Sequence, residues 1–343
     1  MNAFTLGDAP SLTLSRMNRR AFIAVGGTLL FLYRHITGAQ QTTKVWRAGF
    51  LASGVRPSDG APPTTLRKEL ETLGYTEGKN IVYEGRWSHG QNQRLRELAI
   101  ELASRNVDVI IAFGGPAAEA SKQVTSTIPI IVFNAGDVVE TGLVGNLARP
   151  GGNVTGVNDP AAVLSAKRLE FLKELVPRAM RIAVLWNAEN YAMTLRYQEI
   201  EKAAQSRGIA IDPLGVREPD DFDIAFAAMA RARPDALMML TDAFTNLNRQ
   251  RVLDYVGAQQ IPAMYEFADV VRSGGLISYG SDQNEIFKLA AHYVAKVLAG
   301  EKVGNLPIEQ PNRYFLVINL KTAKNLVLTV PPSLLLRADD VIQ

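Results

Sequence analysis

The stretch from Asp108 to Val157 decides the fold of this chain: it reads DVIIAF (108–113), GGPAAEASKQVTST (114–127), IPIIVF (128–133) and NAGDVVETGLVGNLARPGGNVTGV (134–157). An apolar run of six residues bounded by turn residues is typical of a strand that helices cover on both faces. Two such runs with a short helix between them form a βαβ unit. The stretch therefore predicts a parallel sheet.

A glycine-rich turn follows the first of these strands, at Gly114, Gly115 and Pro116. Glycine permits the tight turn, and proline suits the first position of a helix. Such a turn leaves backbone N–H groups at the carboxyl end of the strand, where open parallel sheets bind ligands and where anions are readily held. We expect Gly115, Pro116 and Ala117 to supply backbone donors for an anionic group, with tight turn packing as the alternative.

The composition points to a folded protein of more than one domain. The chain has 343 residues, of which 47% are hydrophobic, so two domains with their own cores are expected. It contains no cysteine, which excludes disulfides, thiolate zinc sites, cysteine nucleophiles and a lipid-anchored amino-terminal cysteine.

The positive charge is concentrated at the amino terminus. Residues 1–40 hold four arginines against one aspartate, a net charge of +3, which equals the formal charge of the whole chain. The remainder is close to neutral, and its basic residues are scattered among acidic ones. The electrostatic footprint of a nucleic-acid-binding protein is therefore missing.

The basic head resembles an export signal. Arg19 and Arg20 precede an apolar run, AFIAVGGTLLFLY, and small residues before Gln40 suit a cleavage site. The run is short for a membrane span, although an uncleaved single-span anchor is the alternative. The paired arginines also resemble a twin-arginine signal, so both export routes stay open, and Met17 is a second candidate start. We expect a periplasmic protein.

From Val45 onward, strand-like and helix-like segments alternate. Strands are predicted at residues 46–52, 80–87, 108–113 and 128–133, with a fifth at VTGV. After a predicted helix at 161–175, a second series places strands at 181–186, 209–216, 236–241 and 262–267. Corresponding strands of the two series start 135, 129, 128 and 134 residues apart. The two series share no clear residue identity, so what repeats is the architecture and not the sequence. We expect an α/β fold of two Rossmann-like lobes with parallel sheets, joined by a multi-strand hinge.

The domain boundaries follow from this alternation. Residues 1–40 are the expected signal peptide, 44–157 with about 283–310 form lobe 1, and 158–282 form lobe 2. A further strand, GLISYGSD, precedes an amphipathic helix that we expect to cross back to lobe 1. Residues 311–343 should hold a strand, a short helix and a final helix that starts at two prolines; their lobe stays open.

Catalytic motifs are sparse. The chain has three histidines, of which His35 lies in the leader and His89 and His292 are isolated. It lacks a Walker loop, a G-x-S-x-G elbow, an H-E-x-x-H pair and a dinucleotide fingerprint. The sequence therefore favours binding without chemistry, with no cofactor and no metal.

Several blocks resemble a known family. They are G-F-L (49–51), L-G-Y-T-E-G-K-N-I (73–81), A-R-P-G-G-N-V-T-G (148–156), K-R-L-E-F-L-K-E-L-V-P (167–177), V-L-W-N (184–187), S-Y-G (278–280) and I-N-L-K-T-A-K (318–324). The chain from Val45 onward is thus similar to the substrate-binding proteins of ABC transporters of the TrpX type. This resemblance implies a type I periplasmic-binding-protein fold, hinge closure over a small-molecule solute, and delivery to an ABC permease in the membrane. Some members are associated with tryptophan or tyrosine.

Candidate ligand contacts in lobe 1 lie just past strand ends. The Ser53 hydroxyl suits a ligand carboxylate, with a plain turn serine as the alternative. Asn134 and Asp137 follow the fourth strand. Asp137 suits a ligand ammonium group or the cap of the next turn.

The candidates in lobe 2 mix polar and aromatic side chains. Trp186 and Asn187 end a strand, where they offer an aromatic wall and an amide. Asp242 is the preferred ammonium partner, with a helix cap before Phe244 as the alternative. The other candidates are Tyr265, Glu266 and Tyr279. Aromatic faces suit flat or cationic ligands, although Trp186 and the tyrosines also suit internal packing.

The expected mechanism is a hinge. Crossovers near Val157, Ser281 and Pro311 let the lobes rotate, and a ligand that contacts both lobes stabilises the closed form. We expect a monomer that binds an amino acid or an aromatic or carboxylate compound. Two alternatives stay open: the effector domain of a regulator, and an exported hydrolase-like enzyme in which Asp137 pairs with Glu266 or Asp242 as two carboxylates.

Overall fold

A computed structural model describes residues 44–343, of which 45–343 form one compact unit, so the expected leader at 1–40 lies outside the described residues. Its first sheet has the order β2-β1-β3-β4-β5, and every pair of neighbours is parallel. The strands are β1 (Trp46–Ala52), β2 (Ile81–Trp87), β3 (Val109–Phe113), β4 (Ile130–Phe133) and β5 (Val154–Gly156). The predicted parallel βαβ unit is therefore present.

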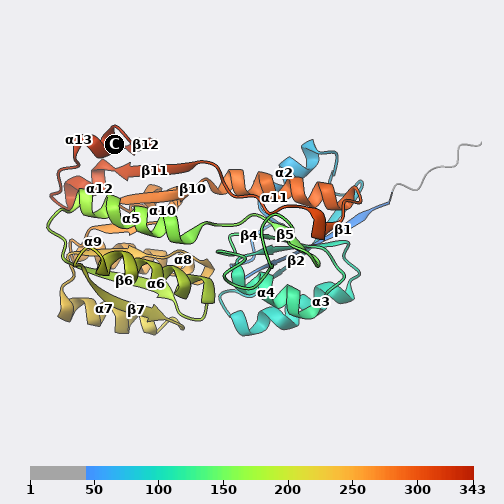
Figure 1. Cartoon of the computed structure of the whole chain (residues 1–343), viewed down its shortest axis with the longest axis horizontal. Helices are drawn as coiled ribbons and strands as arrows, with labels where there is room; N and C mark the ends of the chain where they lie inside the picture. Colours follow the sequence, from blue (N-terminus) through green and yellow to red (C-terminus); the bar gives the residue numbers. More distant parts are fainter. Residues whose placement is uncertain (1–43) are drawn as a thin grey trace, which may run out of the picture. The chain divides into compact units, whose positions relative to one another are not determined.

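Helices cover both faces of this sheet, and together they form lobe 1 (Figure 1). On β1, Phe50 packs into the core under α2 and α11, while Leu51 packs into the core under α3 and α4. This alternation follows from the pleat, which points successive side chains to opposite faces. The helices are α2 (Thr64–Thr72), α3 (Leu95–Ser104), α4 (Gly115–Val124) and α11 (Gln283–Leu298), with short 3₁₀ turns η1 (Asn92–Arg94) and η2 (Val303–Asn305). The late helix α11 packs against α2 and β4, so a distant segment completes this core.

The second sheet has the order β12-β11-β10-β9-β8-β6-β7. All neighbours are parallel except β10 and β11, which are antiparallel. The strands are β6 (Arg181–Asn187), β7 (Ala210–Val216), β8 (Ala236–Met239), β9 (Ala263–Tyr265), β10 (Ile277–Ser281), β11 (Tyr314–Asn319) and β12 (Asp340–Ile342). Residues 311–343 thus add two strands to this sheet. The helix predicted to start at two prolines is present as α13 (Pro332–Leu335), and the strand β12, which was not predicted, follows it.

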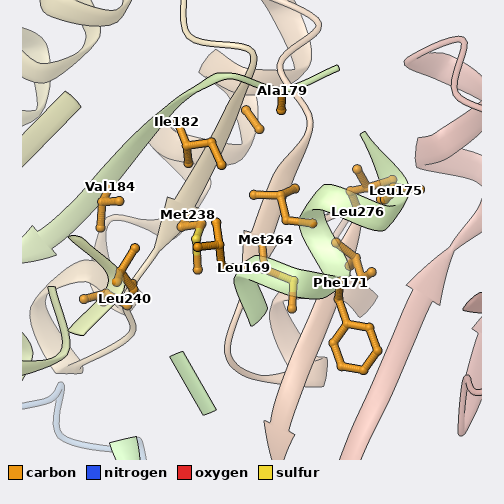
Figure 2. Packing of buried hydrophobic residues seen from close by; sticks show 14 of the residues in the cluster. Leu169, Phe171, Leu175, Ala179, Ile182, Val184, Met238, Leu240, Met264 and Leu276 are labelled. Atoms are coloured by element: carbon orange, nitrogen blue, oxygen red, sulfur yellow. The ribbon is translucent and has the colours of Figure 1, made fainter. Parts of the chain in front are cut away.

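Lobe 2 is built on this second sheet. Its helices are α5 (Ala161–Leu175), α6 (Tyr191–Gln205), α7 (Asp221–Ala232), α8 (Ala243–Leu247), α9 (Arg249–Ala258), α10 (Ala268–Arg272), α12 (Leu320–Asn325) and α13 (Pro332–Leu335). Figure 2 shows part of one core, in which Leu169, Phe171 and Leu175 of α5 gather against Met238 and Met264 of the sheet. Each such fully buried side chain stabilises the fold by roughly 1.5–3 kcal/mol.

The two sheets repeat one plan. Strands β7-β6-β8-β9-β10 stand in the same order as β2-β1-β3-β4-β5, and each of the first four strands in either series begins within two residues of its predicted start. In each series the chain moves from the first strand to one side of the sheet for the second strand, and then to the other side for the third. Ligands of open α/β sheets bind at such switch points, beyond the carboxyl ends of the strands. Two switch points therefore define where a ligand site belongs.

The chain crosses between the sheets three times, after β5, after β10 and before β11. Two of these crossovers are joined: Val157 forms an isolated parallel bridge with Glu309, and the Asn158 N–H donates to the Glu309 carbonyl at 2.8 Å. Among residues 44–343, no helix combines the length and apolarity that a membrane crossing needs.

Candidate ligand-binding cleft

A cavity of about 470 Å³ lies between the carboxyl ends of the two sheets. Lobe 1 lines it with Ser53 after β1, Gly114 after β3 and Asn134 after β4. Lobe 2 lines it with residues that follow β6 and β8, among them Asn190 and Asp242. The cavity therefore sits at both switch points, and its size is that of a small-molecule site.

One wall of the cavity is aromatic. Phe113 and Phe287 line it, and both pack on Phe133, with ring centroids 5.1 and 5.7 Å from that ring. Phe267 of lobe 2 and Leu247 of α8 add apolar surface. A flat apolar group in this cavity would meet rings in offset or edge-to-face geometry, which aromatic pairs prefer.

Polar atoms without partners are concentrated on the same cavity. Six side-chain atoms of its lining residues are buried and have no hydrogen-bond partner in the described part of the chain: Ser53 Oγ, Asn134 Oδ1, Asp159 Oδ1, Arg196 Nε, Thr241 Oγ1 and Asn246 Oδ1. A buried polar group left without a partner costs about 1–3 kcal/mol. Such a group is completed by water or by a ligand. The cavity is therefore suited to a ligand that brings both donors and acceptors.

Asn134 is held in an unusual backbone conformation at the end of β4. Its φ of 52° lies in the left-handed region, which few residues other than glycine adopt. Its Nδ2 donates to Gln283 Oε1 at 2.7 Å, at the start of α11. That bond fixes the side-chain amide, so the orientation of its unpartnered oxygen is defined.

A buried ion network underlies the lobe 2 side of the cavity. Glu266 is fully buried; its Oε1 accepts from Arg168 Nη1 at 2.7 Å and from Arg196 Nη1 at 2.9 Å, and its Oε2 accepts from the Thr241 N–H at 2.9 Å. Arg196 Nη2 also pairs with Asp159 Oδ2, in the crossover after β5. Two guanidinium groups thus face two carboxylates, and the network is neutral.

The environment moves the pKa values of the two arginines in opposite directions. Burial lowers the pKa of Arg196, but attraction to Asp159 and Glu266 outweighs burial and raises it above its ordinary value. Burial, with repulsion from Arg196, lowers the pKa of Arg168 despite the attraction of Glu266. Both groups stay charged, because arginine is not deprotonated in proteins.

The sequence did carry a signal for these two arginines, which the prediction missed. Arg168 lies four residues after Leu164 and four before Leu172, and Arg196 stands in the same way between Ala192 and Ile200. All four of these neighbours are buried. An arginine at helical spacing within an apolar stripe faces the core, where its charge requires a partner.

Asp242 lines the cavity, but other groups already occupy its carboxylate. Its Oδ1 accepts from the N–H groups of Phe244 and Thr245, both at 3.0 Å, and so caps α8. Its Oδ2 accepts from Asn187 Nδ2 at 2.7 Å and from Asn190 Nδ2 at 3.1 Å. The helix-cap alternative stated for Asp242 therefore describes its contacts in the structure.

The turn before α4 differs in detail from the expectation. Gly114 is the N-cap with φ of 93°, Gly115 is the first helical residue, and Pro116 comes second. Pro116 lines the cavity, but the expectation that it supplies a backbone donor is wrong, because proline has no N–H. Gly115 and Ala117 retain first-turn N–H groups without an intrahelical acceptor, although neither residue lines the cavity.

The predicted residues divide into three groups. Ser53, Pro116, Asn134 and Asp242 line the cavity, and Gly115, Ala117 and Asn187 lie directly behind it. The others serve the surrounding structure: Asp137 Oδ1 caps its own turn, Trp186 stacks on Tyr197, Tyr265 and Glu266 are buried, and Tyr279 packs on Phe171. The lining residues that the sequence reasoning missed include Phe113, Asp159, Asn190, Arg196, Thr241, Phe267, Gln283 and Phe287.

The enzyme alternative pairs Asp137 with Glu266 or Asp242, and of these three residues only Asp242 lines the cavity. Asp137 and Glu266 are both engaged in the contacts above, and neither lines the cavity. Within residues 44–343, no group of three or more histidine, aspartate or glutamate side chains is arranged to hold a metal ion.

Comparisons with known proteins agree with this architecture. A family model described as ABC transporter substrate binding protein matches residues 59–342. A tyrosine-binding protein of Clostridioides difficile is 28% identical over 259 residues, which are 76% of this chain and 74% of that protein. A conserved domain protein from Vibrio cholerae superposes with a TM-score of 0.81 and 26% identity, over 87% of this chain and all of that one. An ABC domain from Streptococcus pneumoniae in complex with L-Trp gives 0.80 and 24%, with the same coverage.

Proposed function

The chain belongs to the family of ABC transporter substrate-binding proteins, and we propose that it captures a zwitterionic amino acid with an aromatic or large apolar side chain. Proteins of this family work outside the cytoplasm, where they bind a small solute and pass it to a membrane permease. The two-lobed fold and the cavity between the sheets suit that role.

The unpartnered oxygen of Asp159 is the observation that carries the proposal. Asp159 Oδ2 is paired with Arg196, but Asp159 Oδ1 is buried without a partner, as is Arg196 Nε. One acceptor and one donor thus stand open on the two members of a single ion pair. An amino acid carries its ammonium and carboxylate groups on one carbon, so a zwitterion supplies the complementary donor and acceptor together. We assign the ammonium to Asp159 in place of Asp242.

Further donors near the cavity suit the ligand carboxylate. The hydroxyl groups of Ser53 and Thr241, one from each lobe, are buried without partners. A carboxylate that accepts from both would link lobe 1 to lobe 2. Because a ligand shifts a conformational equilibrium only through contacts that one state offers and the other lacks, such a bridge favours the closed form.

The charge of the cavity argues against a carboxylate that lacks an ammonium group. Among the described residues that line the cavity, Arg196 is the only basic one, and Glu266 and Asp159 already neutralise it. A simple aromatic acid would bring one uncompensated negative charge into this cavity, which is costly where the charge is shielded from water. A zwitterion brings none.

The aromatic wall indicates the ligand side chain. Phe113 and Phe287 of lobe 1 and Phe267 of lobe 2 line the cavity, so an aromatic side chain would be packed by rings from both lobes. The name of the tyrosine-binding relative, which is 28% identical, supports the same ligand class.

The wider setting belongs to the same proposal. We infer that the chain is exported through its basic amino-terminal leader, acts as a monomer in the periplasm, binds no nucleic acid and catalyses no reaction. Rotation about the three crossovers would open and close the cleft. Asp159 lies in the crossover beside Val157. The proposed contact between Asp159 and the ligand ammonium therefore lies next to the hinge about which the lobes would rotate.

Isothermal titration calorimetry with three matched ligands tests the proposal. L-Tyrosine carries both charged groups, tyramine lacks the carboxylate, and 3-(4-hydroxyphenyl)propionate lacks the ammonium. We expect L-tyrosine, L-tryptophan or L-phenylalanine to bind at least about a hundredfold more tightly than either truncated analogue. The propionate leaves Asp159 without its ammonium partner, and tyramine leaves the Ser53 and Thr241 hydroxyls without a carboxylate. Equal affinity for the propionate or for benzoate would overturn the zwitterion assignment. Recovery of chemically altered ligand after incubation would contradict a pure binder.

A further inference from the structure

We propose that Gly136 and Ala192 form a closure stop: a contact between the lobes, outside the ligand cavity, that sets how far the cleft closes and so sets the ligand affinity. Gly136 belongs to the loop after β4 in lobe 1, and Ala192 lies in the first turn of α6 in lobe 2. Neither residue lines the cavity. The inference rests on the hinge closure in the proposed function, and it assigns positioning residues to that motion.

The two backbones approach each other very closely at this point. A Cβ atom added to Gly136 would lie 2.6 Å from the Cβ of Ala192, whereas carbon atoms pack at about 3.5–4.0 Å. The Cα of Ala192 would be 3.7 Å away, an ordinary contact. This close approach is possible because position 136 has no side chain and because the side chain at position 192 is only a methyl group.

The contact continues along a narrow seam beside the cavity. A Cβ added to Gly115, at the start of α4, would lie 3.4 Å from Asn190 Oδ1 and 3.8 Å from the Cβ of Ala192. Asn190 lines the cavity and donates to Asp242. The seam thus joins the two lobes next to the ligand, through residues too small to keep them apart.

A small wedge in this seam should act on the closed state alone. When the lobes separate, position 136 and position 192 move apart, and an added methyl group meets nothing across the cleft. When the lobes close, the same methyl group collides. Apparent affinity falls in proportion to the fraction of molecules that can close, so a residue that never touches the ligand controls its binding.

The chain supplies a matched control for the wedge. Gly136 and Gly142 lie six residues apart with φ of 77° and 74°, so alanine is strained equally at both positions. A Cβ at Gly142 would meet nothing within 4 Å. Any effect of Gly136→Ala beyond that of Gly142→Ala therefore comes from the contact across the cleft and not from backbone strain.

The experiment compares four variants: Gly136→Ala, Gly142→Ala, Ala192→Gly, and the double variant Gly136→Ala with Ala192→Gly. Calorimetry would measure the affinity for the tightest amino acid ligand. We expect Gly136→Ala to weaken binding about 10- to 100-fold, the usual range for overpacking, and Gly142→Ala to leave it within about twofold. The double variant should recover most of the loss, because it removes the opposing Cβ. Equal losses in the two alanine variants, or no recovery in the double variant, would overturn the closure stop.

A second readout needs no ligand assignment. The chain has no cysteine, so Ile100→Cys and Ile224→Cys would place one spin label on an exposed site of each lobe. We expect Gly136→Ala, but not Gly142→Ala, to remove the shortest inter-lobe distances from the distribution. If no amino acid binds the unmodified protein, the proposed function fails, while the distance distributions still decide the closure stop.

Discussion

Glu266 and Asp242 of lobe 2 differ from Asp159 of the first crossover in how many of their carboxylate oxygens accept hydrogen bonds from the protein. Glu266 accepts from two arginines and a backbone N–H, and Asp242 accepts from two backbone N–H groups and two amides. Asp159 pairs one oxygen with Arg196 and leaves the other buried without a partner. Position at a strand end therefore did not distinguish ligand contacts from structural groups. We propose that the remaining hydrogen-bonding capacity of each side chain makes that distinction.

Replacing Glu266 should have the largest effect, and it tests whether a carboxylate that accepts hydrogen bonds at both oxygens stabilises the fold. Glu266→Gln leaves two buried guanidinium groups facing Asp159 alone, so we expect the free energy of unfolding to fall by about 3–5 kcal/mol. Urea unfolding followed by circular dichroism would measure the change. Glu170→Gln is the matched control, because Glu170 pairs with Lys167 and Arg207 at the surface. Such exposed pairs contribute about 1 kcal/mol or less. Similar losses in both variants would contradict a structural role for the buried network.

Two matched carboxylate-to-amide changes compare Asp159, which has an unpartnered oxygen, with Asp242, whose oxygens both accept hydrogen bonds from the protein. Asp159→Asn removes the charge that we propose faces the ligand ammonium, so we expect amino acid affinity to fall by about 2–5 kcal/mol. Asp242→Asn preserves an N-cap side chain, since asparagine caps as well as aspartate, and should lower affinity by less than about 1.4 kcal/mol, or tenfold. Calorimetry on both variants gives the ranking. A larger loss in Asp242→Asn would return the ammonium to Asp242.

The smallest effect concerns a surface carboxylate of lobe 2. A hydrogen bond from Ser333, followed by interaction with Arg337, lowers the pKa of Glu174 below its ordinary value of 4.5. A group with a lowered folded pKa stabilises the protein above its unfolded pKa and loses that contribution as the pH falls through the folded pKa. We expect Glu174→Gln to lower the free energy of unfolding at pH 7 by less than about 1 kcal/mol. This difference should shrink as unfolding is repeated below pH 4.5, and a difference that grows in acid would contradict it.

The fold was predictable because its signals are local. Apolar runs bounded by turn residues marked the strands of both series, and the helix at Ala161–Leu175 agrees with its predicted limits. The alternation of strand-like and helix-like segments predicted parallel sheets, whereas the order of the strands within each sheet was not predicted. The addition of β11 and β12 to the second sheet was not predictable, since an antiparallel partner is selected by long-range contacts that no local pattern records.

The site was predictable only in part. The strand-end rule found Ser53, Asn134 and Asp242, because the carboxyl ends of parallel strands meet at one edge. The rule could not find Arg196, which reaches the cavity from a helix. It also could not tell an occupied carboxylate from an available one, because hydrogen-bond partners come from distant segments.

The three crossovers have a consequence for how the protein is made. The core of lobe 1 includes residues of α11, which starts at Gln283, and the sheet of lobe 2 ends with strands between Tyr314 and Ile342. During synthesis neither core can be completed until more than four-fifths of the polypeptide has left the ribosome. An unfinished chain therefore lacks the contacts that complete either core, so both lobes reach their native packing only near the end of synthesis.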